Sequence, residues 1–272
     1  MNAKIAVTQM NCKLGDVQEN LRRMSKLAKR AGKMEVDLIV FPELVTTGYS
    51  LNEKWVDLAE EIPGPTTEKL GKIATEFGFN LIAGMAERDS ISNRIFNSAV
   101  VLNPQGNVIG AYRKIHLWAN ERTYFTPGKE FHVFQTSLGP IGVGICYDLE
   151  FPEAARVMAI QGAQTLIFPA ADMDPFSKQI ETFLRSRAAE NGVFVAFSNR
   201  YGREGDTFFF GRSQIVSPTC KVLAKTEPSR ELVSAKLNFD ILSKERRSLP
   251  YLEQRMPSTY GLLQSERNPT KP

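Results

Sequence analysis

The sequence predicts an α/β fold with a mixed sheet, on the strength of three observations. Short apolar segments alternate with amphipathic helical patterns along the 272 residues, which is typical of strand–helix–strand units. Strand-like pairs at 95–113 and 131–145 are joined by turn residues, which adds hairpins. No proline-, glycine- or serine-rich linker interrupts the chain, so we predict a single domain over residues 1–263, followed by a flexible tail at 264–272.

The elements of the first half follow from periodicity and from helix-start signals. A helix is predicted at 16–31 because apolar residues recur every three or four positions, as at Leu21, Met24 and Leu27. Pro65 begins a second helix, since a first-turn residue does not need its N–H. Short apolar runs predict the strands of this half at residues 4–9, 36–41, 80–86, 95–102 and 108–113.

In the second half, helical patterns again alternate with apolar runs. We predict helices at 153–161 and 176–190, and each of them precedes a strand. From Asp240 onward the pattern is mixed and polar, which predicts a segment that frays or packs on a partner. The strands predicted in this half are 131–135, 141–145, 165–168, 193–198, 208–216, 221–225 and 232–237.

Composition and charge narrow the class of protein. The chain is 42% hydrophobic and 24% charged, as in ordinary globular proteins, and its net charge is only +4. Basic residues gather on the helix at 16–31, but no aromatic residues lie among them, so a solvated face is favoured over nucleic-acid binding. No stretch approaches the roughly 20 apolar residues of a membrane span, and the N-terminus lacks the apolar core of a signal peptide. We therefore expect no nucleic-acid partner, no membrane and a cytoplasmic location.

The cysteines and histidines predict neither disulfides nor a metal site. Cys12, Cys146 and Cys220 are odd in number and widely separated, which suits a reducing compartment. The two histidines, His116 and His132, lie in different motifs and lack zinc-site spacing. No glycine loop of the phosphate-binding type is present, so we expect no cofactor. Whether Cys12 and Cys220 are reactive is left open.

The central stretch, residues 141–153, reads I-G-V-G-I-C-Y-D-L-E-F-P-E. Cys146 falls where a buried strand ends and before a helical pattern begins. Backbone N–H groups and a helix dipole at such a position favour a thiolate and a developing oxyanion. The alternative is that Cys146 is a small buried core residue, as free cysteine usually is. This stretch alone leaves both interpretations open.

Three predicted strand ends each carry one reactive group. Glu43 follows the strand at 36–41, Lys114 follows the strand at 108–113, and Cys146 follows the strand at 141–145. Ligands gather beyond the carboxyl ends of strands in open α/β sheets. If the three ends converge, a base, a cation and a nucleophile meet in one pocket. Each group alone has an ordinary explanation, because a charged residue after a strand is usually solvated.

Taken together, these segments resemble the nitrilase superfamily of carbon–nitrogen hydrolases. The family's glutamate motif matches F-P-E-L-V-T-T-G-Y at 41–49, its lysine motif Y-R-K-I-H-L at 112–117, and its cysteine motif G-I-C-Y-D-L-E-F-P-E at 144–153. The segment at 120–128, N-E-R-T-Y-F-T-P-G, resembles the family segment that carries a second glutamate. The resemblance covers nearly the whole chain, with the motifs in the family's order.

The resemblance implies a fold, a catalytic set and an assembly. The fold is a four-layer α-β-β-α sandwich, and members assemble as homodimers or larger homo-oligomers. Glu43 is the implied general base, Cys146 the nucleophile, and Lys114 the oxyanion donor together with the backbone N–H of Tyr147. Glu121 is the implied second glutamate, which holds Lys114 or the substrate. The reaction passes through a cysteine thioester and releases ammonia.

The substrate is predicted only as a class, a small aliphatic primary amide or an N-carbamoyl amine. True nitrilases of the superfamily usually carry Trp after the nucleophile, whereas this short chain has Tyr147. Three alternatives remain open. They are nitrile hydrolysis, hydrolysis of a keto-acid ω-amide, and a non-catalytic binding role. An ω-amidase needs a residue that binds the substrate carboxylate, for which Arg187, Arg200 and Arg203 are the candidates.

Several residues near the motifs are candidates for substrate binding. Tyr49 and Tyr147 are expected to line the pocket because of their positions beside the glutamate and the cysteine. Asp172 and Asp174 follow the strand at 165–168, where a carboxylate could bind a cationic amine on the substrate. The ordinary interpretation of both aspartates is a solvated turn.

Overall fold

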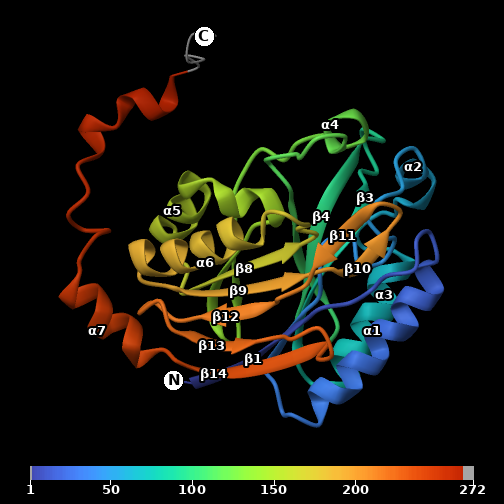
Figure 1. The fold of residues 1–272 in the computed structure, drawn as a ribbon, viewed down its shortest axis with the longest axis horizontal. Coiled ribbons are helices and arrows are strands. Elements are labelled where there is room, and N and C mark those ends of the chain that lie inside the picture. The colour runs from blue at the N-terminus through green and yellow to red at the C-terminus, as the bar shows by residue number, and fades with distance from the viewer. Residues whose placement is uncertain (1, 266–272) are drawn as a thin grey trace.

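The computed structural model describes residues 2–265, and its centre is a pair of six-stranded sheets packed face to face (Figure 1). In spatial order the first sheet contains β14 (Leu232–Asn238), β1 (Asn2–Thr8), β2 (Leu38–Val40), β3 (Asn80–Arg88), β4 (Ile95–Leu102) and β5 (Val108–Arg113). The second sheet contains β13 (Val222–Lys225), β12 (Gln214–Val216), β9 (Phe194–Asn199), β8 (Thr165–Ala170), β7 (Gly139–Val143) and β6 (His132–Thr136).

Helices cover the outer face of each sheet. The first sheet packs against α1 (Val17–Gly32) and α3 (Pro65–Phe77), and the second against α5 (Pro152–Ile160) and α6 (Ser177–Asn191) (Figure 1). Both faces of the first sheet are buried because the side chains of β1 alternate between them. Ile5 and Val7 join the core between the sheets, whereas Ala6 joins the core under α1. The predicted four-layer α-β-β-α sandwich is confirmed.

Polar contacts tie the two sheets together near the ends of their parallel strands. In the first sheet β1, β2 and β3 run parallel, and in the second β7, β8 and β9 do. The hydroxyl of Ser198 on β9 lies 2.7 Å from the carbonyl oxygen of Thr8 and 2.9 Å from that of Val40. The N–H of Glu43 donates to the carbonyl oxygen of Ala170, at 3.4 Å. The carboxyl ends of β2 and β8 therefore meet at one place.

The edge of the first sheet is closed by the last strand of the chain. β14 pairs antiparallel with β1, from Asn2 opposite Asn238 to Thr8 opposite Leu232. The next segment, α7 (Asp240–Ser248), is a helix that buries Leu242 in the fold. The prediction that the chain frays or packs on a partner from Asp240 onward is therefore wrong over this helix. A polar helix with one buried anchor gives too weak a periodicity to be recognised in the sequence.

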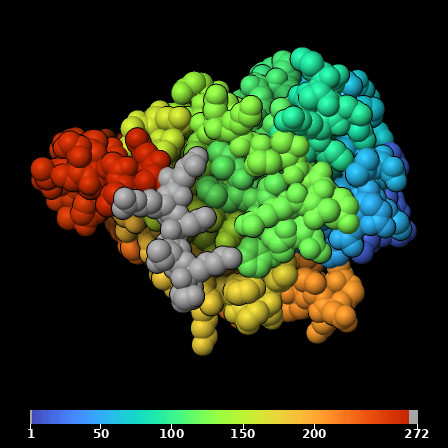
Figure 2. All heavy atoms as spheres, turned by 90° about the horizontal axis from the view of Figure 1, so that it is seen from above, coloured from blue at the N-terminus to red at the C-terminus, as the bar shows by residue number. Residues whose placement is uncertain are grey.

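Between α7 and residue 265 the chain leaves the sandwich and forms the short turns η2 (Pro257–Thr259) and η3 (Gly261–Gln264). Figures 1 and 2 show this red segment projecting from the side of the molecule. The flexible tail predicted at 264–272 lies, from residue 266 on, outside the described residues. No helix within residues 2–265 has the length and apolar character needed to cross a membrane.

The strand predicted at 208–216 is wrong, because this stretch contains two strands with different partners. β11 (Thr207–Phe210) forms a separate hairpin with β10 (Tyr201–Glu204), whereas β12 pairs with β9. Gly211 and Arg212 between them have positive φ angles of 67° and 54°, which break the extended chain. The short α2 (Lys54–Leu58), α4 (Glu121–Tyr124) and β10 had no prediction, since they are shorter than the sequence windows that reveal periodicity.

Candidate active site

Cys146 lies in a strained turn directly after β7. It is the first residue of the 3₁₀ helix η1 (Cys146–Glu150), and its φ of 47° is unusual for a residue with a side chain. The buried carboxylate of Asp148 holds this turn, accepting hydrogen bonds from the N–H of Ile145 at 2.9 Å and the hydroxyl of Tyr112 at 2.8 Å. The residues after Cys146 thus form a 3₁₀ helix, and α5 begins only at Pro152.

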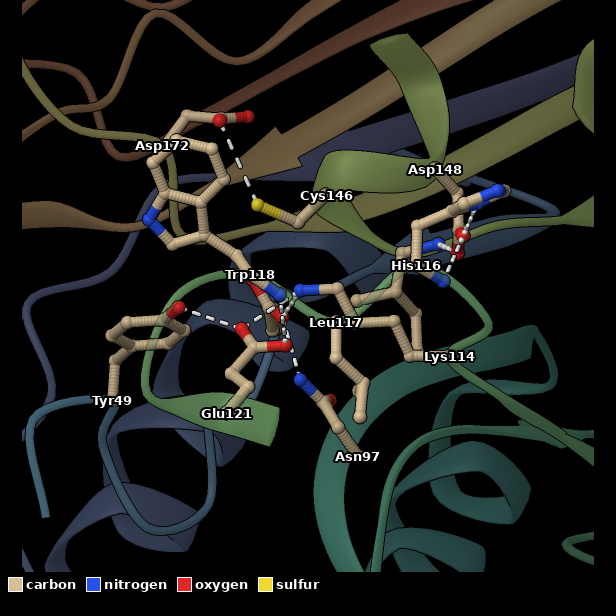
Figure 3. A network of polar contacts seen from close by, with 12 residues as sticks. Tyr49, Asn97, Lys114, His116, Leu117, Trp118, Glu121, Cys146, Asp148 and Asp172 are labelled. Atoms are coloured by element: carbon tan, nitrogen blue, oxygen red, sulfur yellow. Dashed lines mark hydrogen bonds and ion pairs between the residues drawn. The ribbon is translucent and has the colours of Figure 1, made fainter. Parts of the chain in front are cut away.

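His116 belongs to the support of this turn. Its Nδ1 lies 2.7 Å from Oδ1 of Asp148, which also accepts the N–H of His116 at 3.0 Å (Figure 3). The imidazole stacks on the ring of Phe151, with 3.7 Å between the centroids. These contacts give His116 a structural role in joining the lysine and cysteine segments.

Gly144 makes room for a core side chain. A Cβ atom there would lie 2.6 Å from Cε1 of Phe168, which is far inside van der Waals contact. At Gly144 the group that approaches is the aromatic ring of β8.

Lys114 is fully buried between two carboxylates. Its Nζ donates to Oε1 of Glu43 at 2.7 Å. It also donates to Oε1 of Glu121 at 2.8 Å (Figure 3). Burial alone would lower the pKa of Lys114, but Glu121 and Glu43 outweigh it and raise the pKa well above its ordinary value. Lys114 therefore remains an ammonium ion. Asn97 of β4 adds a hydrogen bond of 2.7 Å to Oε1 of Glu43.

Glu121, on α4, is the second carboxylate on Lys114. Its Oε1 also accepts the hydroxyl of Tyr49 at 2.6 Å, and its Oε2 accepts the N–H of Trp118 at 3.2 Å. The N–H of Tyr49 is held in turn by Glu204, a buried residue of β10 that pairs with Arg200. A line of contacts thus runs from the β10–β11 hairpin to the ammonium group.

The thiol of Cys146 donates a hydrogen bond to the carboxyl group of Asp172. The Sγ lies 3.6 Å from Oδ1 of Asp172 (Figure 3), whereas Oε2 of Glu43 is buried with no hydrogen-bond partner among residues 2–265. Burial, followed by Asp172 and Glu43, raises the pKa of Cys146 well above its usual value, against the effect of Lys114. The resting site therefore holds a neutral thiol.

Asp172 is fixed by its backbone at the end of β8. Its N–H donates to Oδ1 of Asn199 at 2.7 Å, and Nδ2 of Asn199 returns a bond to its carbonyl oxygen at 3.1 Å. The residue is 8% exposed, and its Oδ2 is buried without a partner in the described part of the chain. Burial, and then Glu43 and Glu150, raise the pKa of Asp172 to about 7.

The raised pKa of Asp172 gives a testable pH dependence of stability. The folded protein holds this proton more tightly than the unfolded chain, in which the pKa is 3.8, so ionisation destabilises the fold progressively from about pH 4 to about pH 7. Asp172→Asn removes this cost. Urea unfolding should show the free energy of unfolding of the variant, relative to the unsubstituted protein, rising across that range by an amount on the order of 4 kcal/mol.

The exposed Asp174 supplies the matched control for this pH series. Asp174→Asn should give a difference from the unsubstituted protein that does not vary between pH 4 and pH 8. A pH-independent difference for Asp172→Asn as well would contradict the argument.

A narrow cavity of about 20 Å³ opens over the thiol, with room for about one water molecule. Its lining is aromatic and acidic, and contains no arginine, lysine or histidine within residues 2–265. The lining residues are Tyr49, Trp118, Cys146, Tyr147, Glu150, Ala171, Asp172, Met173 and Phe176. Tyr49, Tyr147 and Asp172, the three predicted substrate-binding residues, are all among them.

A family model described as carbon–nitrogen hydrolase matches residues 4–245, most of the chain. The chain belongs to the carbon–nitrogen hydrolase family. A probable nitrilase of Schizosaccharomyces pombe is 35% identical over 271 residues, covering 97% of this chain and all of the relative. The crystal structure of a carbon–nitrogen hydrolase from Helicobacter pylori G27 superposes with a TM-score of 0.91 at 30% identity, covering 97% of this chain and 98% of that one.

A third similar protein is the amidase of Nesterenkonia sp. AN1. One of its structures has 26% identity and a TM-score of 0.81, with 95% of each chain covered. That structure is of a glutamate-to-glutamine variant, and shows covalent addition of the acetamide moiety of fluoroacetamide at the active-site cysteine. This chain is therefore a carbon–nitrogen hydrolase, with nitrilases and amidases among its relatives.

Four charged candidates of the sequence analysis do not line the cavity of this hydrolase. Asp174 is exposed. Arg187 donates to the carbonyl oxygens of residues 149 and 150, Arg200 pairs with Glu204, and Arg203 lies over the ring of Phe208. None of the three arginines lines the cavity, so none is placed to bind a substrate carboxylate there.

The other cysteines of this hydrolase have ordinary surroundings. Cys12 is buried, and burial raises its pKa to about 11, which makes it a poor nucleophile. Cys220 is half-buried, with its Sγ 3.7 Å from the carbonyl oxygen of Arg185. Residues 2–265 contain no group of three or more His, Cys, Asp or Glu side chains that could hold a metal ion.

A larger cavity of about 490 Å³ lies elsewhere, lined in part by Glu87, Arg113 and His132. It contains none of the predicted catalytic residues. The sequence analysis also missed Asn97, Asp148 and Glu204, which hold Glu43, the Cys146 turn and Tyr49. A polar residue inside the apolar run at 95–102 was the available signal for Asn97, whereas Glu204 gave none.

Proposed function

We propose that this hydrolase cleaves a small aliphatic primary amide or an N-carbamoyl amine through a thioester on Cys146. The observation that carries the proposal is the buried ammonium of Lys114, held between Glu43 and Glu121 and close enough to Cys146 to influence its pKa. Such a fixed cation stabilises the negative oxygen that develops when a thiolate attacks an amide carbonyl. The narrow cavity favours a small acyl group.

In the proposed first step, Glu43 accepts the thiol proton of Cys146. Its Oε2 has no other hydrogen-bond partner among the described residues, whereas its Oε1 is bound to Lys114 and Asn97. The sulfur attacks the carbonyl carbon, and the oxyanion is stabilised by Lys114 and the N–H of Tyr147. Glu43 returns the proton to the leaving nitrogen, and ammonia departs from a primary amide.

In the second step, Glu43 takes a proton from water, whose oxygen attacks the thioester carbonyl. The carbon–sulfur bond breaks, the acid is released and the thiol of Cys146 is restored. Glu121 is the positioning residue for Lys114, since it shares the ammonium with Glu43. Covalent addition of an acetamide moiety at the active-site cysteine of the Nesterenkonia amidase shows that the cysteine of that relative is nucleophilic, which supports the role of Cys146 as the nucleophile here.

Three other functions are less well supported. Nitrile hydrolysis would use the same residues, and the probable nitrilase of S. pombe keeps it as a candidate. Hydrolysis of a keto-acid ω-amide is supported by an omega-amidase of Xenopus tropicalis, 33% identical over 255 residues and covering 90% of this chain and 92% of the relative. The cavity is less suited to it, because the lining described within residues 2–265 contains no basic side chain for the substrate carboxylate. A non-catalytic binding role is disfavoured, because a binding protein does not need the buried cluster of Glu43, Lys114 and Cys146.

The proposal includes assembly into a homodimer or a larger homo-oligomer in the cytoplasm. Exposed apolar side chains on α5, such as Ile160 at 51%, and on the projecting segment, such as Leu263 at 67%, support assembly. The three cysteines are unpaired, which supports a reducing compartment. Sedimentation velocity checks the assembly, and a single monomeric species would refute it.

The function is tested by ammonia release from a panel of primary amides, N-carbamoyl amines, ω-amides and nitriles, together with a Glu43→Gln variant. General acid–base groups contribute about 10²–10⁴ in rate, so the variant should lose that factor on amides. p-Nitrophenyl acetate needs no protonation of its leaving group. The variant should still be acylated by it, although more slowly because glutamine cannot take the thiol proton, and it should deacylate more slowly still because glutamine cannot activate water. Intact-protein mass spectrometry should then show one acetyl group on Cys146.

Glu153→Gln is the matched control, because Glu153 is exposed on α5. It should retain full ammonia release and accumulate no acetyl group. Ammonia release by Glu43→Gln at the unsubstituted rate would refute the assigned role of Glu43. Acid formation from nitriles alone would favour the nitrilase alternative.

A further inference from the structure

The charges around the cavity of this hydrolase are unbalanced. Four carboxyl groups, those of Glu43, Glu121, Glu150 and Asp172, surround the thiol and its cavity, and the described residues supply one ammonium group, that of Lys114. Lys114 is already bound to Glu43 and Glu121. The guanidinium of Arg187 donates to the carbonyl oxygen of Glu150 and offsets part of the charge of that residue, but it does not line the cavity. Among residues 2–265, the lining itself therefore contains no cation to offset the charge of Asp172 and Glu150.

Asp172 also has an unused acceptor. Its Oδ1 contacts the thiol, but its buried Oδ2 has no hydrogen-bond partner within residues 2–265. An unpaired buried acceptor is costly, and a bound donor would remove that cost. The residue lines the cavity and is more than nine-tenths buried, so the missing donor would have to come from the molecule that occupies the cavity.

Aromatic rings form the rest of the mouth of the cavity. Trp118 packs edge-on against Tyr147 and Phe176, with ring centroids 4.8 and 6.0 Å apart, and Tyr49 lies on the same lining. Aromatic faces attract cations, and most strongly where water is excluded. Rings beside carboxylates make a surface that suits an alkylammonium group.

We propose that the substrate carries a protonated amine, which binds to Asp172 Oδ2 with Glu150 and the aromatic rings of the cavity around it. This assignment rests on the proposed amide hydrolysis and narrows its substrate to small amino-amides. Of the two aspartates considered from the sequence, Asp172 is the one in the cavity, and Asp174 is exposed.

The bound amine would also activate the nucleophile. Burial, and after it Asp172 and Glu43, hold the pKa of the Cys146 thiol high. An ammonium group bound to Oδ2 of Asp172 offsets the field of the carboxylates and makes Oδ1 a weaker acceptor for the thiol. The thiol can then pass its proton to Glu43 more readily. The enzyme would thus keep Cys146 as an unreactive thiol until a cationic substrate is bound.

The test compares amides matched in shape but differing in charge: glycinamide with propionamide, β-alaninamide with butyramide, and 4-aminobutyramide with pentanamide. Ammonia release gives kcat/KM for each. The cationic member should exceed its neutral partner by about tenfold or more in at least one pair, as expected for one charge contact in a partly desolvated site. Succinamate, the anionic counterpart, should be the poorest substrate.

Variants then assign the preference to residues. Asp172→Asn should bring the cationic-to-neutral ratio close to one, chiefly by loss on the cationic member, and Glu150→Gln should lower the ratio less. Asp174→Asn and Glu153→Gln, both of exposed residues, should leave it unchanged. The inference is overturned if neutral amides are preferred in every pair. An equal loss on both members in Asp172→Asn would also overturn it, because Asp172 would then serve the thiol alone.

A second measurement does not depend on turnover. Cationic 2-aminoethyl methanethiosulfonate and anionic 2-sulfonatoethyl methanethiosulfonate both modify thiols, and peptide mass spectrometry gives their rates at Cys146 and at Cys220. Dividing by the rate at Cys220 removes the intrinsic reactivity of each reagent. The cationic-to-anionic ratio should be at least about tenfold higher at Cys146 than at Cys220.

The two measurements separate failure of the inference from failure of the proposed function. Equal ratios at the two cysteines, together with hydrolysis of neutral amides, would refute the cation site and leave the amidase standing. A raised ratio at Cys146 with no hydrolysis of any amide would support the cation site and refute the amidase.

Discussion

Replacing Cys146 by alanine should abolish amide hydrolysis, with a fall in kcat of roughly 10⁴-fold or more, since loss of a catalytic nucleophile has costs up to about 10⁶. The thioester cannot form without the sulfur. Without the attack of the sulfur no oxyanion develops at the substrate, so Lys114 has nothing to stabilise. Steady-state ammonia release measures the effect, with the best substrate of the panel. Mass spectrometry after p-nitrophenyl acetate should find no acetyl group at this position.

The fold should tolerate this change, because it removes a single atom from a small buried side chain. Circular dichroism and the thermal midpoint check that point. Cys220→Ala serves as the matched control, because Cys220 is half-buried and does not line the cavity, and it should keep full activity. If Cys146→Ala retained a tenth of the original rate, another nucleophile would have to be sought.

Replacing Lys114 by methionine should damage both activity and stability. Loss of an oxyanion donor typically lowers kcat by about 10²–10³. The substitution also leaves Glu43 and Glu121 buried without their shared cation, and breaking a buried pair costs about 3–5 kcal/mol. Ammonia release and urea unfolding measure the two effects.

A second substitution separates these effects. Lys114→Met combined with Glu121→Gln removes one of the two uncompensated charges, so it should recover a large part of the lost stability while activity stays low. Lys72→Met, which changes an exposed lysine of α3, is the control and should leave both quantities near those of the unsubstituted protein. If the double variant were as unstable as the single one, the charge explanation would fail.

The fold class and the reactive groups at the strand ends could be predicted because each depends on the local pattern within one segment of the sequence. Apolar periodicity located most strands and helices, and the reactive residues stood directly after the strands. The structure brings Glu43 and Lys114 into contact although they are 71 residues apart. The catalytic roles of these residues stay a prediction, for which the substitutions above are the test.

The contact between Cys146 and Asp172 could not be predicted, because it depends on the relative position of the β7 and β8 ends and on which acceptors are left free. The same is true of Glu204, whose hydrogen bond to the N–H of Tyr49 crosses 155 residues. α7 and the split at Gly211 were missed for a different reason. Their local patterns are too short or too polar to stand out in the sequence.

The pairing of β14 with β1 has a consequence for synthesis on the ribosome. β1 is made first, but its outer edge is covered only when β14, beginning at Leu232, has emerged. Until then the N-terminal strand carries an open row of backbone donors and acceptors, a template for pairing with other nascent chains. The edge of β1 is therefore protected only after about the last sixth of the chain has been made. Chains shortened before Leu232 would keep that edge exposed, which favours aggregation.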